Sequence, residues 1–282
     1  MIDEFDRRHP LVTLIFYGTI VGMTITSRHM GMAIISLICA IVYLMVLGKV
    51  TLKKILVLIP VFIISAIINP LFSHKGMTVL FFNPWGNAIT LEAVVYGILS
   101  ALLVCAMIVW FMSFNLLMRE DKILSLIGNI APNVATLISM TIRMFDRLKR
   151  KYLEIKSVNA RLTKKSIVKN VKYMSIAITW LLENSIDTAD SMESRGYGLK
   201  KRTSFSNYQL VLRDILVIVY LVGLTLAEIY IIWAMNVRAY YYPVIKIDNN
   251  ILLYAVFTLH CLTAVLIDLW EEIRWLRLRS KI

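Results

Sequence analysis

Cysteine is scarce in this sequence. Three cysteines occur in 282 residues, Cys39, Cys105 and Cys261, and each lies inside an apolar run far from the other two. No pair has the CxxC spacing of a zinc site or a redox motif. The sequence therefore predicts neither a metal site nor a disulfide framework.

Catalytic motifs are absent as well. There is no GxxxxGKS or GxxxxGKT phosphate-binding loop, no HExxH pair, and no paired-aspartate motif suited to a magnesium–diphosphate site. A nucleophile elbow is also missing. We therefore expect a non-catalytic chain with no cofactor. The N-terminal MIDEFDRRHP lacks the pattern of a cleavable signal, so Leu11 onward is read as a retained first span.

Acidic residues are few, with 18 Asp and Glu against 31 Lys and Arg, for a formal charge of +13. Much of the excess falls in residues 118–208, which hold 17 basic and 8 acidic residues beside apolar runs. No helix-turn-helix pattern or aromatic-rich basic strand accompanies this charge, which argues against nucleic acid as a partner. Anionic lipid headgroups and acidic protein partners are its natural complement.

Long apolar runs dominate the rest of the chain. Hydrophobic residues make up 59% of it, and the mean hydropathy is +0.71, well above a soluble domain. Each run approaches the roughly 20 apolar residues that cross a bilayer. The run limits are soft, so five spans are also compatible. We predict an all-α polytopic membrane protein with about six spans: Leu11–Thr26, Gly31–Leu47, Ile55–Ser73, Ala93–Met118, Ile215–Met235 and Ile251–Ile267.

Basic residues predict the orientation of these spans. With a cytoplasmic N-terminus, 27 of the 31 Lys and Arg face the cytoplasm, as the positive-inside rule requires. The four that fall outside are Arg28, Lys75, Arg238 and Lys246. We therefore place both termini in the cytoplasm of a multi-pass cell-membrane protein.

Residues 119–208 form a predicted cytoplasmic insert. It separates an N-terminal membrane block of about four spans, residues 1–118, from a C-terminal block of about two, residues 209–282. On the outer side, the β-prone segments Thr78–Phe82 and Ala88–Leu91 flank the turn residues 83–87, which predicts a small hairpin. In the third span, Pro60 and Pro70 predict a kink or a helix stop.

The insert opens with a predicted short helix, Asp121–Ile130, stopped by Pro132. Two long amphipathic helices follow, because apolar residues recur at steps of three and four. The first stripe contains Val134, Leu137, Thr141, Met144, Leu148, Tyr152, Ile155 and Val158, and Arg143, Arg147, Lys149, Arg150, Lys151 and Lys156 form a charged, solvated face opposite. The second contains Ile167, Val171, Met174, Ile178, Leu181, Ser185, Ala189 and Met192.

An arginine closes each long helix. Arg161 follows the run that ends at Ala160, and Arg195 follows the run that ends at Ser194. Gly196 and Gly198 come next and predict a helix C-cap. Joined by a short loop, the two helices should be antiparallel or cross, with the arginines at opposite ends.

The run Thr188–Gly198 resembles the Ala-Met-Glu-Ala-Arg-Gly-Tyr signature of the transmembrane T component of energy-coupling factor (ECF) transporters, the CbiQ/EcfT family of ABC-type importers. The resemblance includes the order of apolar blocks and the segment Ile89–Glu92, and covers most of the chain. It also implies two short motifs, Ala160-Arg161-Leu162 and Ser194-Arg195-Gly196. The first departs from the family pattern, because many members have Gly at the position of Leu162.

This resemblance implies a coupling role. The T component holds a small substrate-binding membrane protein, the S component, and sits on two cytoplasmic ATPases that hydrolyse ATP. The motif arginines dock into acidic grooves on these ATPases, and the coupling helices pass their motion to the S component. Substrate specificity belongs to the S component, so vitamins, their precursors and transition-metal ions all remain open.

Two ionisable residues inside the spans leave other functions open. Glu228 and His260 lie in apolar surroundings, where such groups are costly and often functional. We favour a structural hydrogen bond or a contact with another helix. The alternatives are an ion- or proton-coupled transporter that uses this pair, and a non-transport scaffold whose basic insert recruits acidic proteins or lipids.

Overall fold

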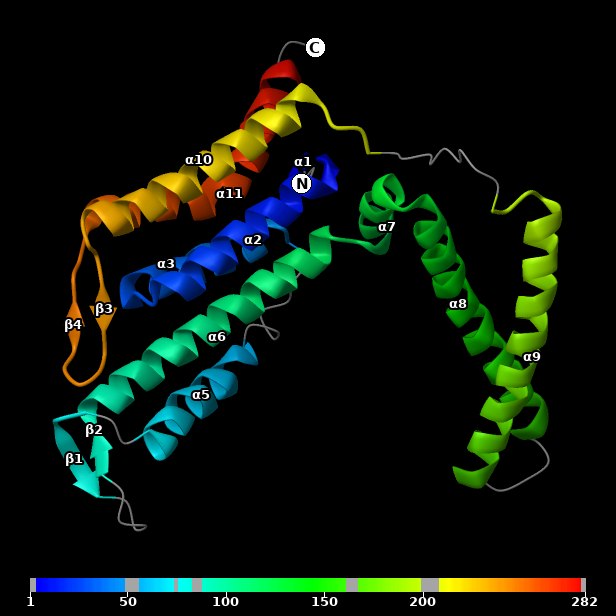
Figure 1. Ribbon diagram of the computed structural model, residues 1–282, viewed down its shortest axis with the longest axis horizontal. Coiled ribbons are helices and arrows are strands. Elements are labelled where there is room, and N and C mark those ends of the chain that lie inside the picture. The colour runs from blue at the N-terminus through cyan, green and yellow to red at the C-terminus, as the bar shows by residue number, and fades with distance from the viewer. Residues whose placement is uncertain are drawn as a thin grey trace. The chain divides into compact units, whose positions relative to one another are not determined.

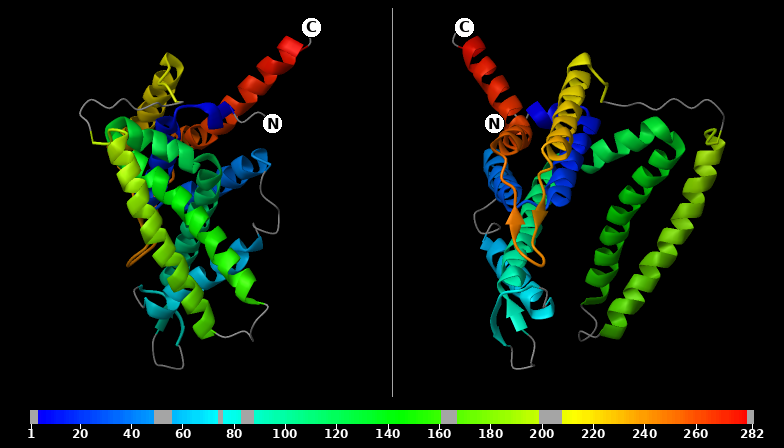
Figure 2. Two further views of the ribbon diagram at one scale, coloured as in Figure 1. Left: turned by 90° about the vertical axis from the view of Figure 1, so that its right-hand side faces the viewer. Right: turned by 60° about the vertical axis from the view of Figure 1, so that its left-hand side comes forward.

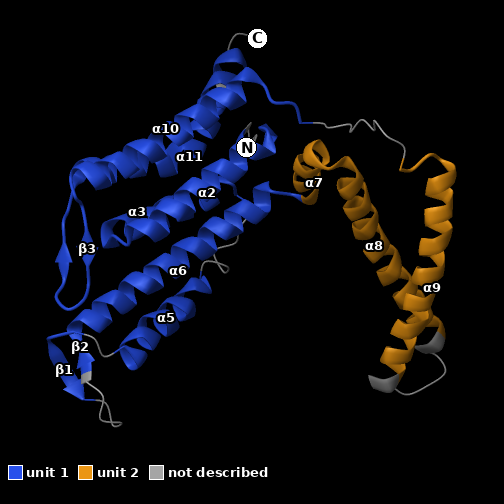
Figure 3. Cartoon of the chain, viewed as in Figure 1, with its two compact units in different colours: residues 1–119, 208–282 blue, residues 120–207 orange. Residues whose placement is uncertain are grey.

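The computed structural model describes residues 4–48, 56–73, 76–82, 88–160, 167–198 and 208–279. The chain is mostly α-helical and divides into two compact units (Figure 1, Figure 3). Unit 1 comprises residues 1–119 and 208–282, and unit 2 comprises residues 120–207.

The helices of unit 1 have the character of a membrane protein. Four of them, α2, α6, α10 and α11, are long and apolar enough to cross a bilayer. Two more, α3 and α5, are also apolar but have 17 and 15 residues. The bounds are α1 Glu4–Arg7, α2 Pro10–Ser27, α3 Met30–Val46, α5 Leu58–Phe72, α6 Leu91–Leu117, α10 Leu212–Ala234 and α11 Ile251–Arg279.

Helix α11 is longer than the apolar run Ile251–Ile267 that the sequence analysis took as a span, because it continues to Arg279. Its last turns are amphipathic and include a Glu271–Arg274 pair at 3.5 Å, so charge marks the end of the apolar run but not of the helix. In α5, Pro60 lies in the first turn, where its missing N–H is not needed, and Pro70 lies near the C-terminal end.

Two strand hairpins connect helices of unit 1. The predicted one is confirmed: β1 (Val79–Phe82) pairs antiparallel with β2 (Ala88–Thr90). The second, β3 (Ala239–Tyr240) with β4 (Lys246–Ile247), was not predicted. The sequence signals for it were a Tyr-rich run, which is β-prone, and Pro243, which favours a turn.

The core of unit 1 lies where α2, α3 and α6 pack together, with α10 and α11 completing it (Figure 1). Trp110 is 1% exposed and packs edge-to-face against Phe16 and Tyr17, with ring centroids 5.9 and 5.8 Å away. Its Nε1 donates to Ser36 Oγ at 2.9 Å, and Ser36 Oγ lies 3.2 Å from Thr24 Oγ1. The indole N–H is thus satisfied in an apolar environment, where an unpaired donor is costly.

Helices α5 and α6 approach closely at Gly97. A Cβ atom there would lie 2.6 Å from the backbone oxygen of Ala66 and 3.1 Å from Pro70 Cδ. The absence of a side chain therefore permits the contact, as small residues commonly do between membrane helices.

Unit 2 consists of α7 (Glu120–Ile130), α8 (Pro132–Ala160) and α9 (Ile167–Ser194). Pro132 ends the short helix as predicted and is also the first residue of α8, a position that tolerates its missing N–H. Helices α8 and α9 lie side by side and run antiparallel (Figure 1, Figure 2).

Candidate functional site

The C-terminal end of α9 has a defined geometry. Tyr197 N donates to Met192 O at 2.9 Å, and Gly196 N donates to Glu193 O at 2.9 Å. These two bonds form a Schellman motif, which requires a left-handed residue after the helix. Gly196 supplies it with φ +81°, and Gly198 follows with φ +97°. The predicted glycine C-cap is therefore confirmed.

This cap determines where Arg195 lies. Its backbone N donates to Met192 O at 3.1 Å, so Arg195 occupies the last position before the chain turns away from the helix axis. Its side chain is exposed and forms no ion pair with the described residues. A permanently charged, five-donor guanidinium is thus held at a rigid helix end and is free to receive a carboxylate.

Acidic side chains surround Arg195 at the C-terminal end of α9. Asp187, Asp190 and Glu193, in the last turns of α9, are exposed. They oppose the helix dipole, which favours cations at a C-terminus. Arg195 matches that dipole, and Ser194 Oγ donates to Ser191 O at 2.9 Å and stays on the helix. Arg195 is therefore the cationic tip of an otherwise acidic helix end.

The other predicted motif lies at the end of α8. Ala160 is the last residue of that helix. Arg161 and Leu162 lie outside the described residues. Because α8 and α9 are antiparallel, Ala160 and Ser194 lie at opposite ends of the hairpin (Figure 2). A helix of 28 residues, such as α9, is on the order of 40 Å long.

The packing face of α9 matches the predicted stripe only in part. Leu181, Ser185 and Met192 of that stripe are half-buried, as are Tyr173 and Trp180 outside it, and Ala177 is fully buried. The stripe members Val171, Met174 and Ile178 are 65%, 43% and 43% exposed. The hairpin thus leaves part of each predicted stripe open to another surface.

Lys151 also differs from its predicted place on the solvated face of α8. Its Nζ lies 5.6 Å from the centroid of the Trp180 ring, a cation–π contact to α9, and donates to Glu154 Oε2 at 3.1 Å. Nearby, Ser185 Oγ lies 3.9 Å from Met144 Sδ across the same interface. The interface between α8 and α9 is therefore partly polar.

A separate cluster occupies the interior of unit 1. His260 Nδ1 lies 3.0 Å from Glu228 Oε1, and His260 Nε2 lies 3.1 Å from Thr19 Oγ1. Glu228 and His260 are fully buried, and they join α10, α11 and α2. This is the helix-to-helix hydrogen bond that the sequence analysis favoured. Thr19 was missed, because nothing in the sequence connects it to His260, 241 positions away.

Glu228 is incompletely satisfied within this cluster. Its second oxygen, Oε2, is buried without a hydrogen-bond partner among the described residues. No group of three or more His, Cys, Asp and Glu that could hold a metal ion occurs in the described part of the chain. The cluster can therefore share or carry a proton, but it has no metal-ligand set.

Comparison with known proteins adds no assignment to these observations. No protein-family model matches the chain, and no curated protein matches it.

Proposed function

We propose that this chain is the transmembrane coupling subunit of an ECF-type ABC importer. In this proposal unit 1 is the multi-pass membrane part, with about six spans and both termini in the cytoplasm. Unit 2 is the coupling hairpin. The chain has no catalytic activity of its own, and ATP hydrolysis takes place on two partner ATPases.

The observation that carries the proposal is Arg195 at the Schellman-capped end of α9. A glycine with φ +81° fixes the helix end, and the exposed guanidinium next to it has no ion-pair partner among the described residues. Guanidinium forms planar, bidentate hydrogen bonds with carboxylate, which suits an acidic groove on a partner protein.

The second element of the proposal is the length of the hairpin. Ala160 and Ser194 lie at its opposite ends, on the order of 40 Å apart along a helix of 28 residues. With Arg161 following the first and Arg195 the second, two arginines can dock into two separate ATPases. Movement of the ATPases would then be transmitted through α8 and α9 to the S component.

The test is ATP-driven uptake by variants of the two arginines. In cells that contain the cognate S component, Arg161→Ala with Arg195→Ala should abolish uptake of its vitamin or transition-metal ion while the protein stays in the membrane. Uptake by the Arg195→Lys variant should also be low, because an ammonium cannot form the bidentate pair with a carboxylate. Arg143→Ala, on the exposed face of α8, is the matched control and should transport normally. Normal uptake by the double variant would refute the proposal.

A second candidate is supported by the Glu228–His260 pair. A fully buried carboxylate with one oxygen unpaired among the described residues is unusual within a membrane and is a natural proton carrier. In an ion- or proton-coupled transporter, a Glu228→Gln, His260→Ala variant would lose uptake while coupling to ATPase activity persists. In the coupling-subunit proposal, any loss of uptake in this variant is accompanied by loss of the folded protein.

A further inference from the structure

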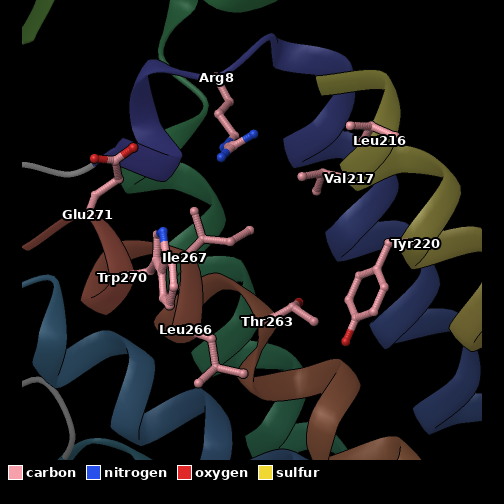
Figure 4. A pocket seen from close by; sticks show the side chains of 9 residues that line it. All are labelled: Arg8, Leu216, Val217, Tyr220, Thr263, Leu266, Ile267, Trp270 and Glu271. Carbon is pink, nitrogen blue, oxygen red and sulfur yellow. The ribbon is translucent and has the colours of Figure 1, made fainter. Parts of the chain in front are cut away.

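A pocket of about 390 Å³ lies at the end of unit 1 where the N-terminal segment, the start of α10 and the end of α11 meet (Figure 4). Ligand pockets commonly begin at about this volume. Its walls are mostly apolar, and two charged side chains, Arg8 and Glu271, also line it. The other lining residues are Leu216, Val217, Tyr220, Thr263, Leu266, Ile267 and Trp270.

The Arg8 side chain is only 16% exposed and points into this pocket (Figure 4). Its Nη1 atom lies 3.6 Å from Asp214 Oδ1, an ion pair that is too long for a hydrogen bond. Its Nε is buried and has no hydrogen-bond partner among the described residues. Since guanidinium carries five N–H donors, Arg8 keeps unused donors at a site where leaving them unpaired is costly.

Glu271 supplies the opposite charge on the other side of the pocket (Figure 4). Its side chain is 21% exposed, and it accepts from Arg274 at 3.5 Å, which leaves acceptor capacity on the carboxylate. Arg8 and Asp214 compensate each other, as do Glu271 and Arg274. The two charged residues that line the pocket, Arg8 and Glu271, are therefore of opposite sign and cancel each other.

The charge in the pocket lies at one end. Arg8 and Glu271 lie there, while the uncharged side chains of Thr263, Leu266 and Tyr220 lie toward the other end (Figure 4). Trp270 is 71% exposed beside Glu271, as expected of an aromatic residue at the level of lipid headgroups. A ligand that fits this pattern has a charged head and an apolar tail.

We propose that this pocket binds one phosphatidylethanolamine molecule. The phosphate accepts hydrogen bonds from Arg8, the primary ammonium donates to Glu271, and an acyl chain lies between α10 and α11. A zwitterion suits a neutral set of charges better than an anionic lipid does. Choline lacks N–H donors and is recognised by a cage of aromatic faces, whereas Trp270 and Tyr220 lie on opposite sides of the pocket (Figure 4).

The test uses the full-length protein in vesicles with equal parts of phosphatidylethanolamine, phosphatidylglycerol and phosphatidylcholine. Lipid retained after gentle extraction is counted by native mass spectrometry. We expect phosphatidylethanolamine to be enriched roughly tenfold over each other lipid, the factor for about one charge-assisted hydrogen bond. No enrichment over the vesicle composition, a preference for phosphatidylglycerol, or equal retention of phosphatidylcholine would each overturn the proposal.

Variants assign the two ends of the headgroup. Glu271→Gln should lower the retention of phosphatidylethanolamine and leave phosphatidylglycerol unchanged, whereas Arg8→Gln should lower both. The exposed neighbours provide matched controls, and Glu272→Gln and Arg7→Gln should retain lipid as the unmodified protein does. Because Glu271→Gln keeps the Arg8–Asp214 pair intact, it tests the site even if Arg8→Gln fails to fold. Equal effects of Glu271→Gln and Glu272→Gln would contradict the assignment. The lipid pocket does not depend on the proposed docking of ATPases, so the two proposals can fail separately.

Discussion

The two units of this chain handle their apolar residues in opposite ways. Unit 1 buries Phe16, Tyr43 and Trp110 almost completely in one core and satisfies the Trp110 N–H there. Among the described residues of unit 2, the only buried hydrophobic residue is Ala177. Large side chains such as Phe145 and Leu182 are 66% and 62% exposed.

The difference indicates what must cover each unit. The exposed apolar side chains of unit 1 lie on helices with few charges, and lipid can cover them. Those of α8 and α9 share their helices with a strongly charged face, so the interior of a bilayer does not suit them. Exposed apolar stripes on long charged helices are typical of surfaces that bind other proteins. The exposed apolar side chains of unit 2 therefore fit the partner binding that we propose for it.

The sharpest test of this contrast compares two aromatic truncations. Trp110→Ala should lower the free energy of unfolding by about 3–5 kcal/mol, because it removes a fully buried ring. Phe145→Ala should change it by less than about 0.5 kcal/mol, because the ring is 66% exposed. Denaturation of the purified protein in detergent measures both. Similar destabilisation by the two variants would show that unit 2 has a core of its own.

Packing within unit 1 should be equally sensitive at Gly97. Gly97→Ala places a methyl group 2.6 Å from Ala66 O and should destabilise by about 1–3 kcal/mol, because α5 and α6 must separate. Gly223 on α10 has open space around it and serves as the control. Gly223→Ala should be neutral or slightly stabilising in the same denaturation experiment. An equal loss in both variants would refute the close approach of α5 and α6.

In unit 2 the sensitive position is the cap of α9. Gly196→Ala forces a Cβ into φ +81° and should cost about 1–2 kcal/mol locally. The amides of Gly196 and Tyr197 should then exchange faster with deuterium. The amount of partner ATPase that is recovered with the purified chain should fall. Gly196→Asn should be milder, because Asn tolerates the left-handed region. If ATPase recovery stays unchanged although amide exchange is faster, the cap of α9 is not needed for partner binding.

The smallest expected effect is a pH dependence of unit 1. His29 lies between α2 and α3, and burial lowers its pKa below 6.5, while the negative charge of Asp248 opposes this shift. The unfolded chain therefore takes up the proton first, so the contribution of His29 to stability is fully present well above pH 6.5 and is lost as the pH falls through that value. Burial lowers the pKa of His9 as well. His29→Gln should make the decline shallower in unfolding measured from pH 7.5 to 5, and an unchanged slope would exclude His29.

Local chemistry explains which parts of the fold the sequence could predict. Gly196 after an amphipathic run signals a left-handed cap, and residues 83–87 signal a turn between two β-prone segments. Both signals act over a few residues. The cap at Gly196 and the pairing of β1 with β2 are confirmed, while residues 83–87 lie outside the described residues. For α11 the sequence analysis located only the apolar run, which ends at Ile267, whereas the helix itself continues to Arg279.

Tertiary relations were less accessible. Periodicity identified α9 as amphipathic, and Ser185 of its predicted stripe does contact α8, but Val171 and Ile178 are exposed while Ala177 and Trp180 are buried or half-buried. Periodicity detects only hydrophobic residues, whereas small and polar residues of α9 also pack against α8. The Glu228–His260 bond was one option among others, because the rotation of α10 and α11 about their axes cannot be predicted from the sequence.

In the proposed function, unit 2 docks two ATPases through Arg161 and Arg195. The most direct measurement is gentle affinity purification of this chain from native membranes, followed by mass spectrometry of the associated proteins. We predict recovery of P-loop ATPases together with a small hydrophobic membrane protein, and loss of the ATPases from the Arg161→Ala, Arg195→Ala variant. Recovery of this chain alone from membranes that express it well, or equal ATPase recovery with the double variant, would contradict the account.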